Sequence, residues 1–229
     1  MGFAKWGRRE IKIVTAVTCT SAASIGFCAL FYGLRSGFWW VAFFWAPVLL
    51  LGVVGLRFFR DPERRAPEGE RLVVAPADGR VVEVDEPVED EFVGKARRMA
   101  IFMSLFNVHV NRAPVSGEVA HMRARAGAYH NAASRAAAVE NAAHDLGLKT
   151  RWGPVLVRQV AGVVARHIIC DTQIGQHLRR GERFGMIKYG SRLEVWVPEG
   201  AKFRWRVRVG DRTKAGETVI GEFLDEGKE

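Results

Sequence analysis

Residues 181–200 read GERFGMIKYGSRLEVWVPEG and contain two runs of apolar and β-branched residues, with Gly190 and Ser191 between them. Runs of this composition are typical of strands, and a small, flexible pair between two of them is typical of a hairpin turn. Short runs of the same kind, separated by glycine, proline and aspartate, fill most of the sequence from residue 71 onward. The sequence therefore predicts a mainly β domain, and it raises the question of whether Ser191 serves only a turn.

Two other segments refine this fold class. The segment RLVVAPADGRVVEVDE (71–86) predicts a strand, a turn at Asp78-Gly79 and a second strand. The segment NAASRAAAVENAAHD (131–145) is rich in alanine and predicts a helix. The domain is therefore expected to be of the β-rich α+β class.

Two pairs of glycines repeat with the same spacing, Gly175 with Gly181 and Gly210 with Gly216, and each pair precedes an apolar run. Hairpins with this spacing are similar to those of the small β-sandwiches of lipoyl and biotinyl carriers. The alternative is two ordinary hairpins with glycine at positive φ. No lysine lies in a carrier-type turn, so the pattern does not predict a carrier function.

The N-terminal part has a different character. Ile13–Leu34 and Phe38–Leu56 contain no charged residue, and only Arg35, Ser36 and Gly37 separate them. A membrane span needs about 20 apolar residues. The sequence therefore predicts a hydrophobic helical hairpin in the membrane, within a segment 1–60 that precedes a soluble domain 61–229. A buried core hairpin, or one that dips into a single leaflet, is the alternative.

Basic residues flank this hairpin on both sides, and the chain carries a net charge of +9. Because only Arg35 lies between the two runs, the positive-inside rule places both ends in the cytoplasm. The excess charge favours an anionic membrane surface over nucleic acid, for which no motif is visible. The flanking residues are Lys5, Arg8, Arg9 and Lys12 before the hairpin, and Arg57, Arg60, Arg64 and Arg65 after it.

The three cysteines, Cys19, Cys28 and Cys170, form no CxxC pair and no even-numbered framework. They fit a reducing compartment and predict neither a disulfide scaffold nor a metal site.

Several blocks of the sequence, in order, resemble the short bacterial and archaeal-type branch of the phosphatidylserine decarboxylases. The resemblance covers nearly the whole chain from about residue 55, and the hydrophobic N-terminal hairpin is also similar to that branch. The blocks are FFRDPER (58–64), APADG (75–79), FMSLFNVHVNR (102–112), VRQVAGVVARHIIC (157–170), GERFGMIKYGSRLEVWVP (181–198) and VRVGDRTKAGETVIGEF (207–223).

The resemblance implies a proenzyme that cuts its own backbone. The bond would be Gly190–Ser191, giving a β chain of residues 1–190 and an α chain of residues 191–229. Ser191 would become a covalent pyruvoyl group, which forms a Schiff base with the serine amine of phosphatidylserine and takes up the electrons left by CO2. The product would be phosphatidylethanolamine, made at the cytoplasmic side of the cell membrane.

A serine hydroxyl needs a neighbouring base to become a nucleophile. The self-cleavage site of the family resembles a Ser-His-Asp triad, and His109 and Asp78 stand at the matching positions here. His109 is also the first candidate for the proton donor after decarboxylation. Taken alone, Asp78 before a glycine is an ordinary turn residue, and a single histidine in an apolar strand is usually structural.

Two departures from the family pattern limit the site assignment. Phe106 stands where the longer branch has a second histidine, and most charged residues of the segment matching 131–144 are replaced. Glu140 and Asn141 are therefore only candidates for headgroup contacts, and no headgroup-binding residue is assigned. Archaetidylserine or another phosphoserine lipid is an alternative substrate, a non-catalytic membrane adaptor is an alternative of another class, and a homo-oligomer stays open.

Overall fold

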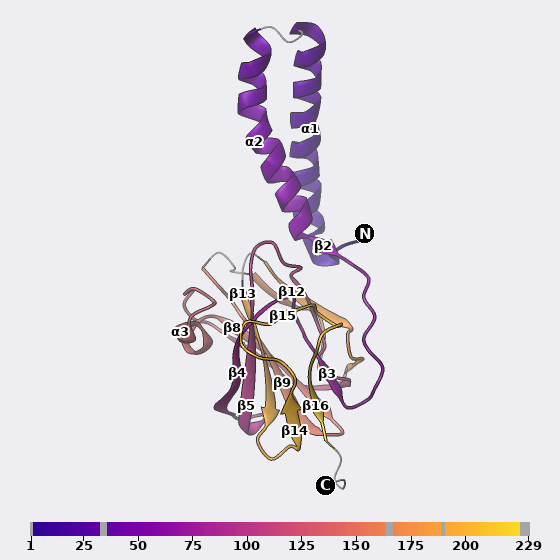
Figure 1. The fold of residues 1–229 in the computed structure, drawn as a ribbon, viewed down its shortest axis with the longest axis vertical. Coiled ribbons are helices and arrows are strands. Elements are labelled where there is room, and N and C mark those ends of the chain that lie inside the picture. The colour runs from indigo at the N-terminus through magenta and orange to yellow at the C-terminus, as the bar shows by residue number, and fades with distance from the viewer. Residues whose placement is uncertain (1, 33–35, 164–166, 189–190, 225–229) are drawn as a thin grey trace. The chain divides into compact units, whose positions relative to one another are not determined.

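The structure is a computed structural model that describes residues 2–32, 36–163, 167–188 and 191–224 of the chain. It divides into two compact units, Met1–Pro62 and Glu63–Glu229. Figure 1 shows the two helices of the first unit and the strands of the second.

The first unit is a helical hairpin. Helix α1 (Arg8–Tyr32) follows a short 3-10 turn (Lys5–Gly7), and helix α2 (Ser36–Phe58) follows α1. The two helices pack closely, because a Cβ added at Gly52 would lie 2.0 Å from Thr18 Oγ1. Beyond the helices, strands β1 (Gly2–Phe3) and β2 (Arg60–Asp61) pair antiparallel. The helical hairpin predicted for this segment is thus present.

The surface of this hairpin is apolar. Side chains such as Leu30, Trp40 and Phe43 are 80%, 68% and 71% exposed. The hydroxyls of Thr18 and Ser21 bond to carbonyls one turn back in α1, so these polar groups are satisfied within the helix. Over Lys5–Phe31 the chain is helical, long and apolar enough to cross a membrane, and the described part of α2 adds a shorter apolar stretch, Phe43–Phe58.

The second unit is built on an eight-stranded, antiparallel sheet, which confirms the mainly β class. Strand β13 lies in its middle and pairs with β9 on one side and β5 on the other. The order is β11 (His177–Leu178), β7 (Gly117–Arg125), β8 (Ala143–Thr150), β9 (Gly153–Val160), β13 (Ser191–Pro198), β5 (Gly94–Met103), β4 (Gly79–Asp90) and β15 (Arg212–Thr213).

Two three-stranded sheets complete this unit. Their strands are β10 (His167–Cys170), β12 (Arg183–Lys188) and β6 (Val110–Arg112) in one sheet, and β14 (Phe203–Trp205), β16 (Val219–Phe223) and β3 (Leu72–Val74) in the other. The first carries the stretch before residue 189 and the second carries the C-terminal strand.

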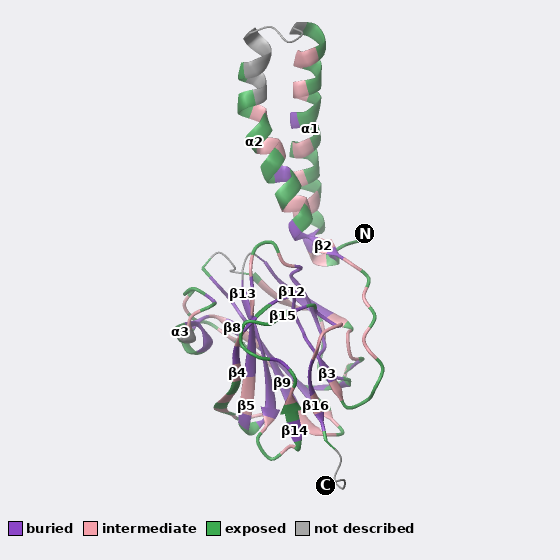
Figure 2. Ribbon diagram, viewed as in Figure 1, coloured by how far each residue is buried: buried purple, intermediate pink, exposed green. Residues whose placement is uncertain are grey.

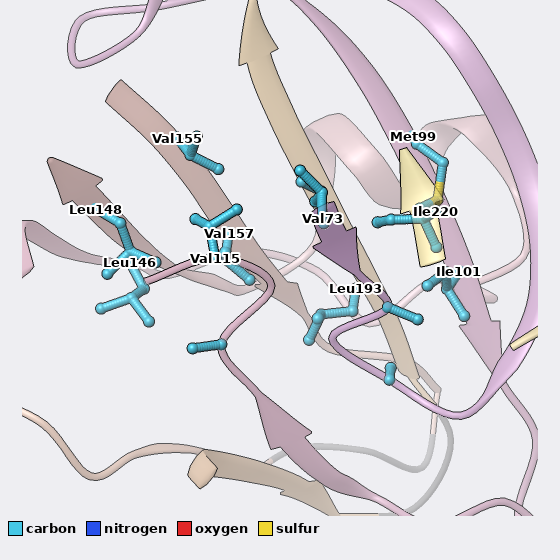
Figure 3. Close-up of a cluster of buried hydrophobic side chains, with 14 of the residues drawn as sticks. Val73, Met99, Ile101, Val115, Leu146, Leu148, Val155, Val157, Leu193 and Ile220 are labelled. Carbon is cyan, nitrogen blue, oxygen red and sulfur yellow. The ribbon is translucent and has the colours of Figure 1, made fainter. Parts of the chain in front are cut away.

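The apolar core lies on the inner face of the large sheet (Figure 3). Alternate residues of β13 point into it, as the period of a strand requires, so Leu193 and Val195 are fully buried. They pack in one cluster with Met99 and Ile101 of β5 and with Ile220 of β16. Figure 2 shows that β13 and the neighbouring strand β9 are buried along most of their length.

The strand–turn–strand prediction for residues 71–86 is confirmed for its two strands, but these strands do not pair with each other. Strands β3 and β4 exist, but β3 pairs with β16 and β4 pairs with β5, so the chain changes sheets at residues 75–78. Gly79 is the reason that this crossing fits, because a Cβ there would lie 2.1 Å from the Phe102 carbonyl oxygen. The Asp78-Gly79 pair is therefore the entry to an interior strand and not the turn of a hairpin.

The helix predicted over 131–145 is much shorter. Helix α3 covers only Arg135–Glu140, with Ser134 Oγ accepting from Ala137 N as its N-cap. Asn141 ends it, since its side-chain amide bonds to the carbonyls of His130 and Ala161. Alanine content favoured the helix, but the residues after 142 pair as strand β8 and tertiary pairing overrides the local propensity.

All four repeat glycines have positive φ, with values of 84°, 80°, 99° and 76° along the chain. Gly181 and Gly216 also lie close together, because a Cβ on Gly181 would be 3.8 Å from the Gly216 carbonyl oxygen. The spacing found in the sequence thus marks four turns, one at each glycine, with β11 or β15 between the two turns of a pair.

Candidate active site

Ser191 is the first residue of the central strand β13, and its backbone is paired with Met103 of β5. Its side chain lies on the inner face, as Leu193 does two residues later, and is 0% exposed. Its Oγ is buried with no hydrogen-bond partner among the described residues. A buried hydroxyl without a partner costs about 1–3 kcal/mol, and among the described residues Ser191 Oγ is the one hydroxyl in a set of nine such buried atoms.

The other half of the predicted cleavage site, Gly190, lies outside the described residues. On the near side of that gap, β12 ends at Lys188, which is 7% exposed and pairs with His167 of β10. The serine and the end of β12 therefore belong to different sheets, and the Gly190–Ser191 cleavage site stays a prediction.

His109 immediately precedes β6 and is 0% exposed. Its Nδ1 lies 2.9 Å from the carbonyl oxygen of Asn107, and its own carbonyl accepts from Ile187 N of β12 at 3.4 Å. A carbonyl oxygen can only accept, so Nδ1 carries the hydrogen of this contact. In the neutral ring Nε2 is then the basic nitrogen, which is the tautomer that a general base needs.

Asp78 is 8% exposed, and both of its carboxylate oxygens are bound. Arg64 donates to Oδ1 at 2.5 Å and to Oδ2 at 2.8 Å, and Ala215 N donates to Oδ1 at 2.8 Å. Arg64, which the charge pattern placed among the basic flanks of the apolar hairpin, is thus a buried partner of this aspartate. Arg64 is the last residue of the motif FFRDPER, but the motif does not show that its partner is Asp78, fourteen residues later.

The three candidates come together around the end of strand β5. Ser191 pairs with the last residue of β5, while Gly79, directly after Asp78, approaches the neighbouring Phe102 on the other side. Since adjacent strands lie about 4.8 Å apart, the backbones of Ser191 and Gly79 are separated by roughly two strand spacings.

The third candidate, His109, lies next to strand β6, which also approaches the end of β5. Asn111 lies two residues after His109, and its Nδ2 is 3.9 Å from the Met103 sulfur. The contacts of Asp78 include those with Arg64 and Ala215, and the contacts of His109 include those with Asn107 and Ile187. Their assignment to one catalytic unit therefore stays a prediction that their common location supports.

The outer face of the same strand carries a buried charge network that the sequence did not reveal. Arg192 is 0% exposed, its Nε donates to Glu194 at 2.7 Å, and its two terminal nitrogens donate to Glu83 at 3.0 and 2.5 Å. Arg98 also donates to Glu83, at 2.7 Å, and Trp196 Nε1 donates to Glu194 at 2.9 Å. The residue after the candidate serine is therefore fixed by ion pairs.

Burial and pairing act in opposite directions on the pKa values in this network. Burial alone raises the pKa of Glu83, but its hydrogen bonds and attraction to Arg192 and Arg98 outweigh burial and leave that pKa below its usual value. Burial alone lowers the pKa of Arg192, and the attraction of Glu194 and Glu83 raises it above the usual value. Both groups are therefore charged at neutral pH.

The two residues considered for headgroup contacts have other partners. Asn141 is 0% exposed and uses its amide on His130 and Ala161, so its role is structural. Glu140 is exposed and lies 2.9 Å from His130 Nε2.

The part of the chain that the structure describes also contains potential metal ligands and three thiols. No group of three or more histidine, cysteine, aspartate or glutamate side chains is placed to hold an ion there. The three cysteines are free thiols. Burial raises the pKa of Cys170 to about 12, with a further increase from Asp171, so this thiol is protonated at neutral pH.

A pocket of about 400 Å³ adjoins the site at the end of β5, and we call it the β5 pocket. Two lining residues adjoin a candidate residue directly, since Asn107 accepts from His109 and Gly79 follows Asp78, and a third, Ser104, follows Met103, the strand partner of Ser191. The full lining is Gly79, Arg80, Phe102, Ser104, Asn107 and Arg212.

Comparison with known proteins shows which chains this sequence is similar to. The family model described as phosphatidylserine decarboxylase matches residues 52–221, which include Ser191, His109 and Asp78. A phosphatidylserine decarboxylase proenzyme of Aromatoleum aromaticum is 43% identical over 197 residues, covering 85% of this chain and 88% of the relative. The proenzymes of Nitrosomonas eutropha and Nitrosomonas europaea are 42% and 40% identical, covering 78% and 85% of this chain and 83% and 88% of the relatives.

Proposed function

This chain belongs to the phosphatidylserine decarboxylase family and is a lyase that decarboxylates phosphatidylserine, and we propose that it does so with a pyruvoyl group made from its own Ser191. The observation that carries this proposal is the buried Oγ of Ser191, which has no partner among the described residues. A hydroxyl used only for structure would be paired. The relatives are named proenzymes, which fits a chain that must be processed.

In the proposed maturation, Oγ of Ser191 attacks the carbonyl carbon of residue 190. The hydroxyl proton goes to Nε2 of His109, which passes it to the nitrogen of residue 191 as the amide C–N bond breaks, and an ester forms in place of the amide. Loss of the Cα proton of residue 191 expels the carboxylate of residue 190, and water then replaces the nitrogen as ammonia. The result is a β chain of residues 1–190 and an α chain that begins with the pyruvoyl group.

The residues around Ser191 fit this chemistry. His109 presents Nε2 as its basic nitrogen because Nδ1 is committed to Asn107. Asp78 supplies negative charge near this end of the sheet and is held in place by Arg64 and Ala215. A pyruvoyl carbonyl at position 191 would supply the electron sink for the pair of electrons that CO2 leaves behind.

The chain also holds and protects that position. Burial of Ser191 excludes bulk water, and the ion pairs of Arg192 fix the backbone beside it. His109 is the proposed donor of the proton that replaces CO2, because it lies at the same strand end as Ser191 and is fully buried.

The test of maturation is intact mass of the purified full-length protein. The wild type should appear as two chains divided before Ser191, and Ser191→Ala should remain one chain of full mass. Ser116→Ala is a matched control, because the Ser116 hydroxyl accepts a hydrogen bond from Arg180 N away from the site. A full-length wild type with no decarboxylase activity would instead favour the non-catalytic adaptor.

The roles of His109 and Asp78 are separated by a time course of chain separation. Asp78→Asn should slow cleavage strongly, His109→Ala should slow it at least as much, and the double variant should resemble His109→Ala, since the two act as one unit. Normal cleavage by Asp78→Asn would remove that residue from the mechanism.

We also propose that the helical hairpin of residues 1–60 anchors the enzyme in the cell membrane, with residues 61–229 on the cytoplasmic side. The apolar surface of α1 and the basic residues at both ends of the hairpin support this placement. Sedimentation with anionic vesicles, with and without residues 1–56, tests it. Full sedimentation of the shortened protein in high salt would exclude the hairpin as the main anchor.

A further inference from the structure

Three arginines lie in one row across the end of the large sheet. Arg212 of β15 is paired with Arg80 of β4, Arg80 with Phe102 of β5, and Phe102 with Arg192 of β13. Residues directly opposite one another on neighbouring strands share a face of the sheet. The row therefore places two guanidinium groups, those of Arg80 and Arg212, next to each other at the edge of the sheet.

These arginines differ sharply in how their charges are balanced. Arg192 is fully buried and bonded to two glutamates. Arg80 and Arg212 are exposed, and neither has a carboxylate partner within the described parts of the chain. Like charges directly opposite one another destabilise a strand pair, so this pair costs free energy that no described carboxylate offsets. An anion bound between them would offset it.

The anion would lie beside the candidate active site. Arg80 and Arg212 both line the β5 pocket, and its described lining contains no carboxylate. The same pocket contains Asn107, the hydrogen-bond partner of His109, and Gly79, the neighbour of Asp78. The row lies on the face of Arg192, opposite that of Ser191, and the pocket meets the strand end of the serine at Ser104, which follows Met103, the partner of Ser191.

We propose that Arg80 and Arg212 form the subsite for the phosphodiester of the lipid headgroup, an inference that rests on the proposed function of Ser191. The phosphodiester suits this role better than the serine carboxylate. Decarboxylation removes the negative charge of the carboxylate, so cations against it would stabilise the ground state and oppose the reaction. The phosphodiester keeps its charge throughout, and arginine forks bind it with paired hydrogen bonds.

The loop beside the pocket distinguishes a lipid from a free phosphate. Leu105 and Phe106 form its tip and are 48% and 75% exposed. The loop is held at its base, because Asn107 Oδ1 accepts from Ser104 N at 2.9 Å and from Ser104 Oγ at 2.8 Å. Apolar side chains on a fixed turn next to two cations match the boundary between acyl chains and headgroups.

The experiment uses the full-length protein in detergent micelles containing phosphatidylserine. Arg80→Gln and Arg212→Gln should each raise KM about tenfold and leave kcat close to that of the wild type, because a spectator phosphate is bound equally in the ground and transition states. Chain separation, measured by intact mass, should be unchanged.

The matched control is Arg179→Gln. Arg179 is an exposed arginine directly after β11, at the opposite edge of the same sheet. Its replacement by glutamine should leave the KM for phosphatidylserine unchanged. Arg80→Lys should recover part of the lost affinity, since it restores the charge but not the fork.

Two outcomes would overturn the inference. An unchanged KM for phosphatidylserine in both glutamine variants would show that the pair holds no headgroup. A second result would be an unchanged KM for phosphatidylserine in both glutamine variants, together with inhibition by inorganic phosphate of the wild type but not of Arg80→Gln. Arg80 and Arg212 would then form a site for free phosphate and not for a lipid. A wild type that neither separates into two chains nor decarboxylates phosphatidylserine would count against the proposed function. That result differs from the two outcomes above, in which the wild type is active.

Discussion

The two faces of strand β13 are both buried, yet they are built from opposite chemistry. Leu193, Val195 and Val197 point into the apolar core, and each is at most 1% exposed. Arg192 and Glu194 alternate with these residues along the strand and point to the opposite face. Both are 0% exposed and belong to a network of ion pairs. Burial alone therefore does not tell what a side chain contributes.

The inner face stabilises by removing apolar surface from water, worth about 1.5–3 kcal/mol for each fully buried leucine or valine. The outer face gains little net stability over an apolar replacement, because desolvation of the charges offsets their attraction. Its effect is on position. The guanidinium of Arg192 meets carboxylates on its own strand and on β4, and that of Arg158 lies 4.4 Å from the Trp196 ring centroid.

The largest effect should follow from breaking the outer face. Arg192→Met leaves Glu83 and Glu194 buried without their main cation, which should lower the free energy of unfolding by about 3–5 kcal/mol. Urea unfolding in the Ser191→Ala background would measure this on a single uncut chain. Arg204→Met is the control, since Arg204 is 66% exposed in its pair with Glu222 and should change stability by less than about 1 kcal/mol. Equal effects of the two would refute the contrast between buried and surface pairs.

A smaller effect should follow from trimming the inner face. Leu193→Ala should lower the free energy of unfolding by about 2–4 kcal/mol, as the lost burial adds to the cavity left behind. Val139→Ala, at a position that is 72% exposed, should change it little. If the comparison holds, the loss at Leu193 should be the same at high and low salt.

The smallest effect should come from pH and should sharpen the same comparison. Burial lowers the pKa of His144 below 6.5, so the unfolded chain takes up a proton first and stability falls as the pH drops below 6.5. The pKa of Glu83 lies below 4.5, so its stabilisation is complete above 4.5 and is lost as the pH falls through the folded value. Unfolding measured from pH 7 to 4 should show both losses, and His144→Gln should remove only the upper one. An unchanged upper slope would exclude His144 as its source.

The sequence predicted those parts of the fold that depend on local periodicity. The apolar runs predicted the helical hairpin, and the β-branched runs predicted the strands on each side of Ser191. It failed where a choice between distant partners decides the structure. Strand β3 joins β16 in place of β4, and the alanine-rich segment yields to the pairing of β8.

The candidate site shows the same limit. Ser191, His109 and Asp78 were found through a family resemblance, and pattern alone gave only a turn and a histidine. The run SRLEVWVP predicted a strand, but it did not predict that Arg192 and Glu194 would be buried. Arginine and glutamate two residues apart share one face of a strand, and that spacing was the available signal. Their partner Glu83 follows only from the register of the sheet.

The place of residues 191–224 in the sheets has a consequence for the lifetime of the mature protein. This segment supplies β13, in the middle of the large sheet, and β16, in the middle of a small one. A cut before Ser191 would therefore produce two polypeptides that are interleaved and not merely docked. Subunit exchange would require global unfolding, and a damaged prosthetic group could not be replaced by swapping in a fresh short chain. A molecule with a damaged prosthetic group could therefore be replaced only by synthesis of a new chain.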